Sequence, residues 1–114
     1  MRFVDCYPTK GTFSLGEPIR FVVDIEGERG ETAVIHLSII HFTQTTDTLT
    51  QAVSLQKSKQ RFNLEWPAPP ASPRGYGVTV ELRGQSDIVI DSISTAFDML
   101  PDWTIFPRYG FLTL

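Results

Sequence analysis

Hydrophobic and polar residues alternate along most of this chain with a period of two residues. The alternation is cleanest from Tyr76 to Arg83, and it recurs in the segments 19–25 and 61–66. A period of two places successive side chains on opposite faces of a strand, one face against a core and the other in water. The pattern therefore predicts β-strands, and no segment carries a sustained helical period.

Turn residues separate these segments at regular intervals. Glycine and proline are concentrated between them, because glycine adopts positive φ and proline fixes φ and lacks an amide donor. The expected strands are 2–6, 18–26, 32–42, 48–55, 59–66, 75–83 and 87–98. Short strands with regular turns are typical of an all-β fold, and we predict an Ig-like antiparallel β-sandwich of about seven strands.

The phase of each strand also predicts a core. The expected inward residues are Phe21, Val23, Ile35, Leu37, Phe62, Leu64, Trp66, Val78, Val80, Leu82, Ile88 and Ile90. The segment 33–42 is more continuously apolar, as expected for a central strand that is partly covered on both faces. In the last strand the apolar phase changes between Ile90 and Ile93, which indicates a β-bulge.

Length and composition describe an ordinary globular domain. The chain has 114 residues, 41% hydrophobic and 20% charged, with a formal net charge of −3, which fits one domain. Mild acidity argues against nucleic acid as a partner, and the absence of a long apolar stretch argues against a membrane span. The first residues show no basic region followed by an apolar one, so we expect no signal peptide in this chain. The compartment is left open, with an extracellular location favoured for the parent protein if it is exported.

Candidate catalytic and metal-binding groups give little signal. His36 and His41 lie five residues apart on one expected strand, which places them on opposite faces and prevents them from sharing a metal. The acidic group between Asp24 and Glu31 lacks the alternating Asp/Asn and glycine pattern of a calcium loop. No carboxylate pair is marked as a glycosidase site, and no serine nucleophile motif occurs. We therefore expect no catalytic residue, no cofactor and no metal.

Three further residues receive structural interpretations. Cys6 is the only cysteine and is interpreted as a small hydrophobic residue on an edge strand. Trp66 is in phase with the apolar residues of its strand, so we expect it in the core rather than on a sugar-binding surface. Tyr76 follows a proline-rich loop and begins a strand, where its hydroxyl could donate to nearby backbone as in the tyrosine corner of Ig-like domains.

The end of the chain is rich in aromatic residues that follow no strand period. Such rings have large apolar areas and need a surface to pack against. We predict a contact with a following domain, and a ligand platform is the alternative. The residues expected in this interdomain contact are Trp103, Phe106, Arg108, Tyr109 and Phe111.

The segment 98–112, with 102–112 at its heart, resembles the junction of glycoside hydrolase family 66, which contains dextranases and cycloisomaltooligosaccharide glucanotransferases. In that family an N-terminal Ig-like domain ends in a similar Asp-Trp-x-x-Phe-Pro-Arg-Tyr-Gly segment and leads into a catalytic (β/α)8 barrel. Three earlier segments, 10–13, 66–69 and 74–78, are compatible with the same family. The family's catalytic carboxylates lie in the barrel, so none is carried over to this chain.

The resemblance implies an Ig-like sandwich over 1–98 and a connector over 99–114 into a missing C-terminal catalytic domain. The chain would then be a non-catalytic N-terminal accessory domain of an α-1,6-glucan-acting, dextranase-like enzyme. Its partner would be its own catalytic domain. Two alternatives remain open: a carbohydrate-binding module with polysaccharide as partner, and a stand-alone Ig-like adhesion or interaction domain.

Overall fold

The computed structural model describes residues 1–67, 69 and 74–100, and strands account for most of them. In chain order the elements are β1 (Arg2–Pro8), β2 (Thr12–Ser14), β3 (Ile19–Glu26), β4 (Thr32–His41), β5 (Gln44–Ser54), β6 (Lys59–Trp66), β7 (Arg74–Arg83), the short 3₁₀ helix η1 (Gln85–Asp87) and β8 (Val89–Leu100). The prediction of an all-β fold is confirmed.

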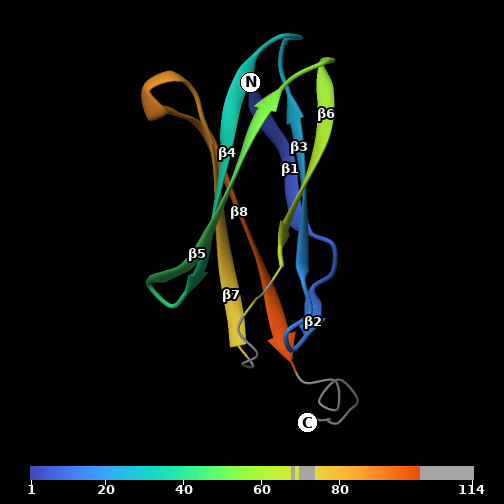
Figure 1. Ribbon diagram of the computed structural model, residues 1–114, viewed down its shortest axis with the longest axis vertical. Coiled ribbons are helices and arrows are strands. Elements are labelled where there is room, and N and C mark those ends of the chain that lie inside the picture. Colours follow the sequence, from blue (N-terminus) through green and yellow to red (C-terminus); the bar gives the residue numbers. More distant parts are fainter. Residues whose placement is uncertain (68, 70–73, 101–114) are drawn as a thin grey trace.

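The strands form two sheets that face each other (Figure 1). One sheet has the order β1-β3-β6, and the other has the order β2-β8-β7-β4-β5. Strand pairs in the described residues are antiparallel, except that β2 runs parallel to the end of β8. The sandwich is confirmed, and β4 is a central strand as expected. The strand missed by the sequence is β2, whose three residues are too few to display a period.

The core lies between the two sheets and follows the predicted phase in most strands. The expected residues that are buried there are Phe21, Val23, Ile35, Leu37, Leu64, Trp66, Val78, Val80 and Leu82. Phe62 is only partly buried and packs against the margin of this cluster. Ile88 and Ile90 were predicted in the core, but 65% and 46% of their surfaces are exposed. That part of the core prediction is wrong.

The exposure of Ile90 is explained by the bulge that the phase change indicated, and the exposure of Ile88 by its place in the turn before β8. Leu82 pairs with Asp91 and Arg83 pairs with Val89, so Ile90 is the extra residue of β8. The extra residue of a bulge is left out of the strand ladder, and Asp91, opposite the buried Leu82, takes the inward position. Ile90 therefore lies outside the core, close to Gly84, where an added Cβ would be 2.9 Å from its Cδ1 atom. The bulge is confirmed, and Ile88 belongs to the turn after η1, where its carbonyl oxygen accepts a 2.8 Å hydrogen bond from the Gly84 amide.

One end of the sandwich is closed by a cluster of aromatic rings. The Phe97 ring on β8 lies 5.2 Å from Tyr76 on β7 and 5.6 Å from Phe13 on β2, measured between centroids. Across the sandwich it lies 5.8 Å from Phe21 and 6.5 Å from Trp66. These contacts join the two sheets at the end where β8 finishes, which we call the exit end (Figure 1).

Candidate functional site

Carboxylates on the outer face of the three-stranded sheet are paired with arginines. The pairs are Arg2–Glu26, Arg20–Glu65 and Arg61–Asp24. The hydrogen bond from Arg61 holds the pKa of Asp24 below its usual value, and the hydrogen bond from Lys10 does the same for the pKa of Glu17. A glycosidase general acid requires a raised pKa. The carboxylates of Asp24 and Glu17 are therefore suited to a water-facing surface and not to proton donation.

The acidic group between Asp24 and Glu31 closes a turn. The Glu31 Oε1 atom accepts a hydrogen bond of 2.6 Å from the Glu28 backbone amide, which lowers the pKa of Glu31. The other carboxylate oxygen of Glu31 lies 3.6 Å from the amino group of Met1. Within residues 1–67, 69 and 74–100, no cluster of three or more His, Cys, Asp or Glu side chains could hold a metal ion.

The two histidines, His36 and His41, lie five residues apart on β4. His36 is opposite Thr50 and Glu81 in the sheet. His41 is at the end of the strand, where its Nδ1 atom lies 3.3 Å from the Gly75 carbonyl oxygen. An odd spacing on a strand turns the two rings to opposite faces, so the pair does not form one site.

Cys6 lies on β1, an edge strand of the three-stranded sheet, and is buried. Its interpretation as a small hydrophobic residue on an edge strand is confirmed. Burial, together with the nearby charges of Asp5 and Asp24, raises the pKa of the Cys6 thiol to about 12. The reactive species of cysteine is the thiolate, so this thiol is poorly suited to nucleophilic chemistry.

We expect Cys6 to resist thiol reagents while the chain is folded. Its pKa rises from 9.0 to about 12, and the thiolate fraction falls about tenfold for each pKa unit. At pH 8 the native chain should react roughly a thousandfold more slowly than the chain in denaturant. Release of thionitrobenzoate from an aromatic disulfide reagent measures both rates. Equal rates would show that the thiol is accessible.

Trp66 and Tyr76 are both buried. The prediction that Trp66 belongs to the core is confirmed, and its Nε1–H donates a 2.8 Å hydrogen bond to the Asp47 Oδ2 atom on β5 of the opposite sheet. The Tyr76 hydroxyl is buried and has no hydrogen-bond partner in the described part of the chain. The tyrosine-corner interpretation is therefore not supported, because it requires a bond from this hydroxyl to backbone.

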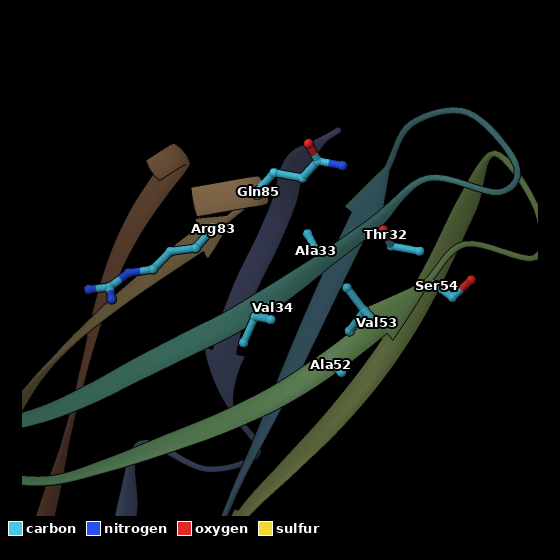
Figure 2. A pocket seen from close by; sticks show the side chains of 9 residues that line it. Thr32, Ala33, Val34, Ala52, Val53, Ser54, Arg83 and Gln85 are labelled. Atoms are coloured by element: carbon cyan, nitrogen blue, oxygen red, sulfur yellow. The ribbon is translucent and has the colours of Figure 1, made fainter. Parts of the chain in front are cut away.

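A shallow depression of about 450 Å³ lies on the outer face of β4 and β5, next to η1. Figure 2 shows small side chains on its floor, including Val34 and Ala52, while Arg83 extends away from them. The Arg83 guanidinium donates hydrogen bonds to Glu81 (2.6 Å) and Asp87 (3.1 Å). The lining offers hydroxyl groups, methyl groups and one paired guanidinium, which do not make an acid–base pair.

A second depression, of about 300 Å³, lies at the exit end. Gly75 and Gly77 of β7 and Ala96 of β8 contribute to its lining, together with Asp98. Nearby, at the turn between β4 and β5, Phe42 exposes 88% of its surface. Sequence reasoning missed Phe42, because it followed an apolar strand and was counted as the strand's last residue.

The interdomain contact predicted from the sequence falls outside the described residues. This applies to Trp103, Phe106, Arg108, Tyr109 and Phe111. The contact therefore stays a prediction, as does the division of the chain into a sandwich over 1–98 and a connector over 99–114. No helix in the described part of the chain is long and apolar enough to cross a membrane.

Comparison with known proteins gives consistent matches. A curated cycloisomaltooligosaccharide glucanotransferase from Niallia circulans is 24% identical over 110 residues, which are 94% of this chain and 11% of that protein. The chain thus spans about a tenth of that relative's length. The crystal structure of a Paenibacillus sp. cycloisomaltooligosaccharide glucanotransferase complexed with cycloisomaltoheptaose has a TM-score of 0.76 at 22% identity, covering 96% of this chain and 15% of that one.

A likeness of fold extends to proteins of other kinds. A Niemann-Pick type C2 protein from the Japanese carpenter ant has a TM-score of 0.58 at 10% identity, covering 87% of this chain and 92% of that one. At such identities a structural match shows the fold alone. The family assignment comes instead from the sequence model of glycosyl hydrolase family 66, which matches residues 8–114. The chain belongs to glycosyl hydrolase family 66.

Proposed function

We propose that this chain is a non-catalytic accessory domain of an α-1,6-glucan-acting, dextranase-like enzyme, and that it supports a catalytic domain that follows it. One observation carries the proposal. Nearly the whole chain aligns with a glucanotransferase, yet it accounts for only 11% of that protein. Most of an enzyme of this type, with ample length for a catalytic barrel, therefore lies outside the segment that the chain represents.

The chemistry of the described residues is in keeping with an inert module. Cleavage of a glycosidic bond uses two carboxyl groups that face each other across a cleft, one of them with a raised pKa. The carboxylates of Asp24, Glu17 and Glu31 have lowered pKa values instead. Each of them accepts a hydrogen bond from a neighbouring side chain or amide.

We propose that the connector over 99–114 supplies the contact between the sandwich and the catalytic domain. Trp103, Phe106, Arg108, Tyr109 and Phe111 are proposed to pack between the sandwich and the catalytic domain. Their aromatic rings have the large apolar area that an interdomain contact requires, and an arginine pairs well with carboxylates or carbonyl oxygens across such a junction.

A carbohydrate-binding module is the second candidate. Rings that stack on sugars need to be exposed and coplanar. Among the described residues, Phe42 is the aromatic side chain that is widely exposed, and one ring is a small platform for a polysaccharide. We therefore rank sugar binding below the supporting role, and a stand-alone adhesion domain below both.

The proposed function is tested with the full-length enzyme and a version that lacks residues 1–98. Without the sandwich, the catalytic domain should unfold at a lower temperature and be digested faster by protease, while its KM for dextran stays the same. The chain by itself should release no reducing sugar from dextran. An unchanged stability with a weaker affinity for dextran would favour the carbohydrate-binding module. Dextran hydrolysis by the chain alone would contradict the proposal.

A further inference from the structure

We propose that the exit end of the sandwich is the surface on which the following catalytic domain docks, with Phe42 and Gly77 as its two main contact points. We call this surface the exit-end patch and define it as Phe42, Gly75, Gly77 and Ala96. This assignment depends on the proposed function, and it adds a second point of attachment besides the connector.

Phe42 is the first observation. Its φ is 57°, in the left-handed region that only glycine and, to a lesser extent, asparagine and aspartate adopt without cost. Its ring contacts His41 at a centroid distance of 4.2 Å but is otherwise 88% exposed. Within this domain the phenylalanine therefore has an unfavourable backbone conformation and little apolar burial. Both features are accounted for if the ring is buried in a partner.

Gly77 is the second observation and is independent of the first. It lies inside β7, with Ile40 on one side and Ala96 on the other. Its φ is outside the left-handed region, and an added Cβ would find its nearest neighbour, the Ile40 carbonyl oxygen, at 3.9 Å. The sandwich itself therefore has room for a side chain here. A glycine inside a strand weakens it, and one common reason for such a glycine is the close approach of another chain.

The two features are neighbours in space. His41, whose ring contacts Phe42, also has its Nδ1 atom 3.3 Å from the Gly75 carbonyl oxygen. Gly75, Gly77 and Ala96 line the depression of about 300 Å³. An exposed ring beside a hollow that is lined in part by glycines is a shape that interlocks with a complementary surface. Aromatic residues at such places contribute much of the binding energy of protein interfaces.

The position of the chain's exit identifies the occupant as the following domain. Figure 1 shows the turn between β4 and β5, the start of β7 and the end of β8 at the same, lower end of the sandwich. Ala96 belongs to β8, which ends at Leu100. A chain that continues from Leu100 therefore leaves beside the patch. The glucanotransferase structure that matches this chain is several times longer, which provides the domain that would cover it.

The test uses Phe42→Asn and Gly77→Thr, each placed in the chain alone and in the full-length enzyme. In the chain alone both substitutions should raise Tm by about 4 °C, because asparagine tolerates left-handed backbone and threonine favours strands. In the full-length enzyme both should accelerate proteolysis at the junction about tenfold. Phe42→Asn removes the aromatic contact with the catalytic domain, and Gly77→Thr fills the hollow that this domain would occupy. Ile88→Asn is the control, since Ile88 is 65% exposed and lies next to η1, outside the lining of the exit-end hollow.

The exit-end patch is supported if Phe42→Asn and Gly77→Thr raise Tm in the chain alone but accelerate junction proteolysis in the full-length enzyme, while Ile88→Asn does not show this reversal. If Phe42→Asn and Gly77→Thr leave junction proteolysis unchanged while deletion of residues 1–98 destabilises the enzyme, the patch is wrong and the supporting role stands. If the deletion is also without effect, the proposed function itself fails. Loss of affinity for dextran, or a wild-type dimer that the variants dissociate, would assign the surface to sugar or to a second copy and overturn the proposal.

Discussion

Replacing Phe97 with alanine should lower the free energy of unfolding by about 3–5 kcal/mol, the usual cost of deleting a buried aromatic ring. The side chain is 3% exposed, and its ring contacts Phe13 and Tyr76 in its own sheet and Phe21 and Trp66 in the other. The cavity would thus open at the point where the two sheets meet. Denaturant unfolding followed by tryptophan fluorescence measures the loss, since Trp66 reports on this cluster.

Ile90→Ala is the matched control for Phe97→Ala. Both residues lie on β8, but Ile90 is outside the core, so its truncation should cost less than about 1 kcal/mol. Phe97→Leu, which keeps apolar volume at the site, should fall between the two. Equal losses for Phe97→Ala and Ile90→Ala would mean that the inward phase of β8 is assigned incorrectly.

The second large effect is expected at the hydrogen bond that joins the sheets. Trp66 Nε1–H donates to the Asp47 Oδ2 atom at 2.8 Å, and the tryptophan is buried. Asp47→Ala would leave the indole donor without this charged acceptor, at a cost of about 1–3 kcal/mol. Urea unfolding of Asp47→Ala measures this cost.

A double-mutant cycle with Trp66→Phe isolates the bond from the packing of the ring. In the Trp66→Phe background, Asp47→Ala should cost less, because the indole donor is already absent and only the hydrogen bond from the Thr48 amide to Asp47 Oδ1 is lost. The coupling between the two positions should therefore be about 1–2 kcal/mol. If the two substitutions are additive, the hydrogen bond contributes nothing to stability, and the loss in each variant has another origin.

The sequence was sufficient to predict the strands with clean alternation. In β3, β6 and β7 the residues Phe21, Leu64 and Val80 are buried as their phase required, because a strand that covers one face of a core repeats its environment every second residue. The family resemblance at the end of the chain pointed to the same family as the comparisons.

The bulge in β8 marks where sequence reasoning fails. A change of phase shows that an extra residue is present, but it does not say which side of the bulge keeps the inward phase. The tertiary partner decides this. Asp91 Oδ2 accepts a 2.9 Å hydrogen bond from the Phe3 amide on β1 of the other sheet. Asp91 therefore takes the inward phase, and Ile90 is left outside.

The exit-end patch cannot be predicted from the sequence, for a related reason. The sequence contains Phe42 and Gly77 but gives neither their exposure nor their neighbours. A glycine in a strand can mark a bend, a crowded position or an approaching partner, and only the register of β4 and β7 shows that Gly77 has open space beside Ile40. Interpreting such residues requires contacts between segments that are distant in sequence.

The parallel pairing of β2 with β8 has a mechanical consequence. Residues 12–14 pair with residues 98–100, and the N-terminus lies at the opposite end of the sandwich from the end of β8 (Figure 1). Tension between these two ends would pull β2 and β8 in opposite directions along their length. The inter-strand hydrogen bonds would then share the force and break together, whereas a hairpin pulled apart from its open end releases them one at a time. A domain attached at the exit end would therefore be tethered through a shear clamp that resists extension.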